Sequence, residues 1–87
     1  MSEDFLRMVE EVRGLDRGDD ELREEDLLDL YKWYKQATVG DCNRERPTGI
    51  LNYKEQAKWD AWDGVRGTSK AEAEGRYIAK AASLMGS

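Results

Sequence analysis

Apolar residues recur along the chain at the three- and four-residue spacing of a helix face, and no segment alternates as a strand would. We therefore predict four helices, over residues 2–15, from Asp19 or Asp20 to Val39, over 52–66, and from Ser69 to about Met85. Gly40 stands where a left-handed C-cap glycine would end the second helix. The Ser69–Glu72 segment has the capping-box pattern that opens the fourth.

The same spacing predicts the buried side of each helix and a compact core for a single domain over residues 1–87. We expect Gly64 and Gly75 to lie inside helices, where each costs about 1 kcal/mol relative to Ala. The irregular stretch over 41–50 is long enough to let neighbouring helices run parallel. The fold class is therefore all-α, a small four-helix domain. The apolar face of the first helix consists of Phe5, Met8, Val9, Val12 and Leu15. The apolar positions of the second are Leu22, Leu27, Leu28, Leu30, Tyr31, Tyr34 and Ala37, and the expected buried side of the third is Ala57, Ala61, Trp62 and Val65.

Charge is unevenly distributed along the chain. The 87 residues hold 19 acidic and 14 basic side chains, giving a net charge of -5, and most of the acids lie before residue 30. An acidic chain is not expected to bind nucleic acid, although the more basic remainder leaves room for a patch that holds a small anion. No apolar run is long enough to span a membrane. With no histidine and a single cysteine, the chain has no Cys–His or Ser–His nucleophile and no internal disulfide.

Aromatic and cationic residues gather on the second and third predicted helices. Tyr31, Tyr34 and Lys35 share one helix face, where two phenols beside an ammonium could stack a planar ring and hold a phosphate. Spacing alone favours the alternative that this stripe packs the core, with the lysine extending past it. It likewise favours a solvated surface charge for Lys58 and a core position for Tyr77.

Two other features do not indicate a functional site. The acidic run from Asp19 to Asp29 lacks the spacing of a calcium loop, so a solvated helix start is expected and no metal site. Cys42 lies near Arg44 and Arg46 without a general base, which favours a passive thiol. We therefore expect no catalytic residue, metal or cofactor, and no enzyme.

Several stretches resemble the signatures of one family. Residues 31–41, YKWYKQATVGD, together with residues 57–62, AKWDAW, and 67–70, GTSK, are similar to the acyl-CoA-binding protein family, especially its small single-domain members. Asn43, Arg46 and Pro47 match the loop between the first two stretches. The resemblance extends from Phe5 to Leu84. It implies a four-helix, up-down-down-up bundle that binds medium- to long-chain fatty acyl-CoA thioesters without catalysis.

The resemblance also implies roles for individual residues. Lys35 and Lys58 would meet the 3′-phosphate of CoA, and the tyrosines would contact adenine and ribose phosphate. Arg13 replaces a family lysine, which keeps the charge but changes the geometry. The implied acyl-CoA-binding residues are Arg13, Tyr31, Tyr34, Lys35, Lys58 and Tyr77, and the acyl groove is expected beside Leu27, Leu28 and Tyr53.

The resemblance further implies a carrier or pool former for acyl-CoA. We expect a monomeric, cytoplasmic protein with at most transient contact with membranes or with enzymes that make or use acyl-CoA. The first loop is longer than in familiar animal members, and a residue is inserted near Thr48, so the family's chain-length preference is not carried over. The alternative is a helical protein-interaction module that has kept the fold and lost the ligand.

Overall fold

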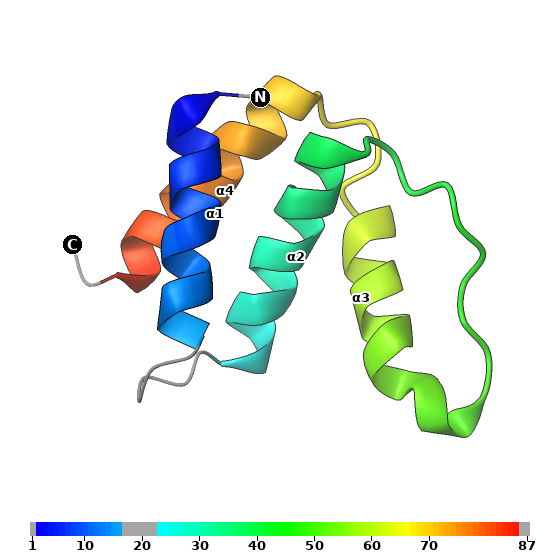
Figure 1. Cartoon of the computed structure of the whole chain (residues 1–87). Coiled ribbons are helices and arrows are strands. Elements are labelled where there is room, and N and C mark those ends of the chain that lie inside the picture. Colours follow the sequence, from blue (N-terminus) through cyan, green and yellow to red (C-terminus); the bar gives the residue numbers. More distant parts are fainter. Residues whose placement is uncertain (1, 17–22, 86–87) are drawn as a thin grey trace.

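The structure is a computed structural model, and it describes residues 2–16 and 23–85. In this part of the chain there are four α-helices and one 3-10 turn, without strands: α1 (Glu3–Asp16), α2 (Glu24–Thr38), η1 (Ile50–Asn52), α3 (Tyr53–Asp63) and α4 (Lys70–Leu84). Figure 1 shows α1 and α4 running in one direction and α2 and α3 in the other. The all-α class and the up-down-down-up order are therefore confirmed.

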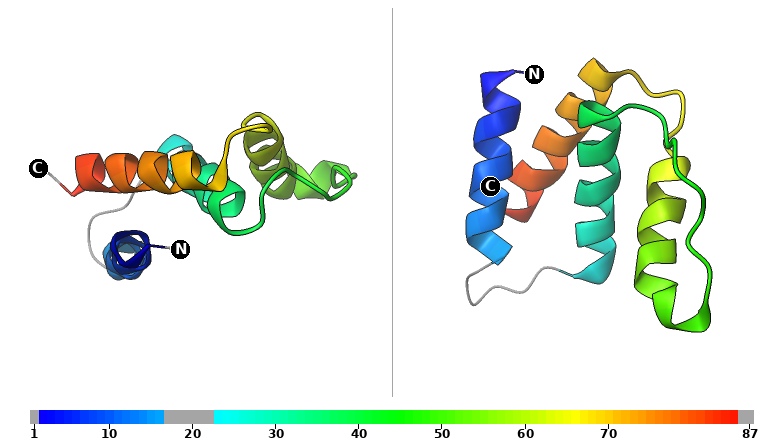
Figure 2. Two further views of the ribbon diagram at one scale, coloured as in Figure 1. Left: turned by 90° about the horizontal axis from the view of Figure 1, so that it is seen from above. Right: turned by 45° about the vertical axis from the view of Figure 1, so that its right-hand side comes forward.

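The four helices form a flat slab with principal extents of 37 × 31 × 15 Å. α2 lies in the middle and packs most extensively against α4 and then α3, whereas α1 packs against α4 (Figure 2). Among the described elements, α3 therefore has one large helix neighbour, which is α2. No helix in this part of the chain is long and apolar enough to cross a membrane.

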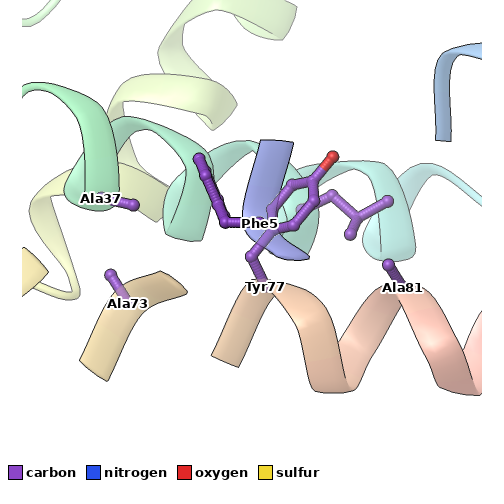
Figure 3. Close-up of a cluster of buried hydrophobic side chains, with 6 residues drawn as sticks. Phe5, Ala37, Ala73, Tyr77 and Ala81 are labelled. Atoms are coloured by element: carbon purple, nitrogen blue, oxygen red, sulfur yellow. The ribbon is translucent and has the colours of Figure 1, made fainter. Parts of the chain in front are cut away.

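The core forms where α1, α2 and α4 meet, around an aromatic pair. The ring of Phe5 is fully buried and meets the ring of Tyr77 edge-on, with centroids 5.2 Å apart (Figure 3). Alanines at positions 73 and 81 flank Tyr77 at four-residue spacing, and their small side chains let α4 approach its neighbours. The predicted apolar face of the first helix packs against this core through Met8, Val9 and Val12, whereas the Leu15 side chain lies outside the described residues.

Polar contacts tie α3 to the C-terminal end of α2. The Trp62 indole is almost fully buried, and its Nε1–H donates to the Gly40 carbonyl at 2.8 Å. Gln36 donates from Nε2 to the Asp41 carboxylate and to the Thr68 carbonyl, each at 2.8 Å. The predicted C-cap at Gly40 is confirmed by its positive φ of 105°, a conformation that glycine adopts without steric cost. The Trp62 bond fixes the C-terminal end of α3, and the Gln36 bonds hold the segments that follow α2 and α3.

Three expectations about the helices are wrong in detail. α2 begins at Glu24 after an extended Arg23, rather than near residues 19–20, which lie outside the described residues along with Leu22. α3 ends at Asp63, so Gly64 caps this helix instead of interrupting it. Of the predicted buried residues on α3 only Trp62 is buried, because a helix with a single large neighbour buries a narrow stripe. Ala57 and Ala61 are half-buried, as is Val65 just beyond the end of the helix.

The predicted helix ends are otherwise confirmed at α1 and α4. Ser2 accepts the Phe5 backbone N–H on its hydroxyl at 3.2 Å, as an N-cap does. Ser69 accepts the Glu72 backbone N–H at 3.1 Å, and α4 ends at Leu84 with Met85 as its cap.

The end of the acidic run is not simply solvated, as the sequence suggested. Lys80 on α4 pairs with Asp26 at 2.7 Å and with Asp29 at 3.3 Å, which joins α4 to the first half of α2. The Lys32 ammonium, followed by Lys80, lowers the pKa of Asp29. In the described part of the chain, no group of three or more His, Cys, Asp or Glu side chains is placed to hold a metal ion.

Candidate functional site

A first hollow of about 250 Å³ opens where α1, α2 and α4 meet. The structure brings to it four of the six residues that the sequence singled out as binding residues, and surrounds them with aliphatic side chains. The four are Arg13, Tyr31, Tyr34 and Tyr77, and the aliphatic lining is Val9, Val12, Leu27 and Leu30.

Tyr77 belongs both to the core and to this hollow. Its side chain is only 4% exposed, and Phe5 holds its ring from the side. Burial, followed by the neighbouring Tyr34 phenol, raises the pKa of Tyr77 to about 12, although Arg13 acts in the opposite direction. The phenol therefore stays protonated at neutral pH and can donate a hydrogen bond. Its hydroxyl has no hydrogen-bond partner among the residues that the structure describes, which leaves it available to a group in the hollow.

A second hollow, of about 350 Å³, separates the first halves of α2 and α3. Leu27 and Leu28 give it an apolar wall on α2. The facing cations come from α3, where Lys58 Nζ lies 5.7 Å from the centre of the Tyr31 ring and 3.4 Å from the Glu55 carboxylate. The full lining is Glu24, Leu27, Leu28, Tyr31, Lys54 and Lys58.

Tyr31 joins these hollows to a third. The third is small, about 70 Å³, and lies toward the long connection, where Arg44 and the indoles of Trp59 and Trp62 contribute to its lining. Tyr31 lines all three hollows, and Leu27 lines the first two. Partial burial raises the pKa of Tyr31, with the Lys58 ammonium opposing this effect. One half-buried phenol therefore has apolar, aromatic and cationic surroundings on different sides.

Two of the predicted residues lie apart from the hollows. The Lys35 ammonium rests over the Trp62 indole, 4.8 Å from its centre, and lines none of the three. Tyr53 is 63% exposed and lines none of them either, so the structure does not bring it to the apolar wall formed by Leu27 and Leu28.

Several lining residues were not predicted, among them Glu24, Arg44 and Lys54. Lys54 precedes Lys58 by four positions, so helical spacing could have placed both on one face. Glu24 is one turn before Leu28, but it was counted among solvated acids. Arg44 belongs to the irregular connection, where its backbone carbonyl accepts the Trp59 indole N–H at 2.7 Å. No periodic signal marks a residue in such a connection.

The fold and the hollows define a class of protein: a small helical domain that can hold a ligand carrying both anionic and apolar parts. The model of the family described as "Acyl CoA binding protein" matches residues 2–81. An acyl-CoA-binding protein of Gossypium hirsutum is 45% identical over 84 residues, which cover 97% of this chain and 90% of that protein. The chain belongs to the acyl-CoA-binding protein family.

Solved structures give the same assignment. The crystal structure of Oryza sativa acyl-CoA-binding protein 2 is similar with a TM-score of 0.84 and 46% identity, over 95% of this chain and 88% of that one. The ACBP of Moniliophthora perniciosa is similar with a TM-score of 0.82 and 44% identity, over 92% of this chain and 76% of that one. The fold is that of this family.

Proposed function

We propose that the protein binds medium- to long-chain fatty acyl-CoA thioesters without catalysing a reaction, and acts as a carrier or pool former for them. Members of its family are binding proteins and generally not enzymes. The observation that carries the proposal is the position of Tyr31, whose ring borders cationic, aromatic and aliphatic surroundings at once. A thioester with a nucleotide head and a hydrocarbon tail needs all three.

The CoA head would lie against the tyrosines and the cations around them. Tyr77 and Tyr34 would donate to phosphate oxygens, Tyr31 would stack on adenine, and Arg13 would add charge at the far side of the first hollow. Lys58 and Lys35 would meet the 3′-phosphate, for which Lys35 has to leave the Trp62 indole. A lysine side chain has enough rotatable bonds for that movement.

The acyl chain would follow the aliphatic wall of the second hollow, formed by Leu27 and Leu28. Each methylene taken from water contributes roughly 0.8 kcal/mol, so about ten buried methylenes would contribute roughly 8 kcal/mol. A hydrogen bond to a charged group contributes about 1.5–3 kcal/mol. The head group would therefore decide which ligand is bound, and the acyl chain would supply much of the affinity.

Calorimetric titration with palmitoyl-CoA, with CoA and palmitate as separate controls, tests the proposal. We expect one-to-one binding of the thioester, and far weaker binding of each control, because each offers only one of the two kinds of contact. Equal affinity for CoA and palmitoyl-CoA would contradict the account of the acyl chain. No heat and no rise in melting temperature with any of the three would contradict the proposed function and favour a protein-interaction module.

The same cargo suggests where the protein works. We propose a monomer in the cytoplasm that exchanges acyl-CoA with enzymes that make or use it. Sedimentation equilibrium tests the monomer, and imaging of the tagged full chain tests the location. A ligand-independent dimer in the first experiment, or confinement to an organelle in the second, would contradict this part of the proposal.

A further inference from the structure

A pair of large aliphatic side chains projects into water at the start of α3. Ile50 is 93% exposed and Leu51 is 94% exposed, whereas Leu6 and Val39 are about half-covered. Tyr53 follows on the same turn and is 63% exposed. Single exposed hydrophobic residues are ordinary, but several large ones side by side mark an interaction surface. We call Ile50, Leu51 and Tyr53 the tip.

Hydrogen bonds hold the tip in shape. The Asn52 amide donates to the Thr48 carbonyl at 2.6 Å, and the Asn52 backbone N–H donates to the Gly49 carbonyl at 3.2 Å. The Gln56 amide adds a bond to the Pro47 carbonyl at 2.9 Å. The exposure of the tip therefore belongs to a built turn, and ordering it on a partner would cost little further entropy.

The tip lies at an extremity of the slab. Figures 1 and 2 show η1 and the start of α3 projecting beyond the start of α2, far from α1 and α4. A stable protein interface needs roughly 20–30 residues on each side. A convex turn with three large apolar side chains cannot supply that area, which argues against a second copy of the chain or another folded protein.

A lipid bilayer does not need a matching surface, because its apolar interior accepts isolated side chains. The charge beside the tip suits a lipid headgroup: Lys54 follows Tyr53 directly and has no ion pair with any residue that the structure describes. Lys54 also lines the second hollow. A bilayer touching the tip would therefore lie beside the mouth of that hollow.

We propose that the tip docks the protein on phospholipid bilayers. Ile50 and Leu51 enter the boundary between headgroups and acyl chains, Tyr53 lies at headgroup level, and Lys54 faces lipid phosphate. Docking in this orientation presents the second hollow to the lipid surface. The contact itself does not require acyl-CoA, so it can be tested on ligand-free protein and stands or falls apart from the proposed function.

Vesicle flotation with the full, ligand-free chain tests the docking, using vesicles of phosphatidylcholine with 30% phosphatidylglycerol. The test variant is Ile50→Ser with Leu51→Ser, and the matched control is Leu6→Ser with Val39→Ser. We expect the test variant to bind vesicles at least about 10-fold more weakly than the wild type, because two large aliphatic side chains no longer leave water. The control should bind as the wild type does.

Three results would overturn the proposal. They are a wild type that does not float with vesicles, a test variant that floats as well as the wild type, and a control that loses as much binding as the test variant. Circular dichroism should show all forms folded, since none of the substituted side chains belongs to the buried core. In solution, the test variant should bind palmitoyl-CoA with the wild-type affinity, because Ile50 and Leu51 line none of the three hollows.

Discussion

Replacing Tyr77 by Phe separates ligand binding from folding at a buried residue of the first hollow. The substitution removes a hydroxyl that has no hydrogen-bond partner among the described residues and keeps the ring that packs against Phe5. The folded protein should therefore lose no hydrogen bond. We expect the free energy of unfolding to change by less than about 1 kcal/mol, since no hydrogen bond within the described chain is broken and the ring keeps its packing.

Binding should respond much more strongly. If the Tyr77 hydroxyl donates to a phosphate oxygen of CoA, its loss removes one hydrogen bond to a charged group, which contributes about 1.5–3 kcal/mol. That range corresponds to a loss of affinity of roughly 10- to 150-fold at 25 °C. Because the pKa of Tyr77 is raised to about 12, the phenol stays protonated, and the loss should be the same at pH 6 and pH 8.

Titration calorimetry with palmitoyl-CoA and urea denaturation of the free protein measure the two quantities. The matched control is Tyr53→Phe, which deletes the hydroxyl of an exposed tyrosine outside the hollows and should change neither quantity. Wild-type affinity in Tyr77→Phe would refute the assignment of this hydroxyl to the ligand. A stability loss of several kcal/mol would instead show that the hydroxyl has a partner within the folded chain.

Two further predictions concern charged groups. Lys58→Ala should weaken palmitoyl-CoA binding at least about 10-fold, with little loss of stability, since the ion pair of Lys58 is exposed. The control for the calorimetric titration is Lys32→Ala, because Lys32 also has an acidic partner three residues before it. Equal effects of the two substitutions on affinity would contradict a specific role for Lys58. The Gly67 backbone N–H donates to the Asp41 carboxylate and lowers its pKa below the usual 3.8. The ionised carboxylate therefore stabilises the fold at pH values above 3.8, and this stabilisation is lost as the pH falls through the lowered pKa of the folded state. Thermal melts from pH 6 to 2 should show a smaller acid-induced drop in melting temperature for Asp41→Asn than for the wild type, and parallel curves would refute the linkage.

The sequence predicts the helix faces well because three- and four-residue spacing is a local property. Phe5 and Leu30 were placed on apolar helix faces and Tyr77 in the core, and all three belong to the buried core. The start of α2 was placed too early because the polar residues before Glu24 favour no particular face. Spacing likewise could not show that α3 has a single large neighbour, and this tertiary fact leaves Ala57 and its neighbours half-buried.

The candidate site was partly predictable for the same reason. Tyr31 and Tyr34 share a helix face, and the structure places both in one hollow. Spacing alone favoured a core position for Tyr77, and the structure gives it both a core ring and a place in the hollow. Arg44 could not be found from the sequence, because a residue in an irregular connection is positioned by long-range contacts.

The way α3 is attached has a consequence for its motion. The Trp62 indole fastens its C-terminal end, and the Gln36 amide holds the connection that follows it, whereas the second hollow separates its first turns from α2. Backbone amides near Lys58 should therefore exchange with deuterium faster than those near Trp62, since local opening is easier where fewer contacts must break. A ligand that fills the hollow would slow exchange mainly in the first turns of α3. Isotope uptake along this one helix thus reports how fully the hollow is occupied.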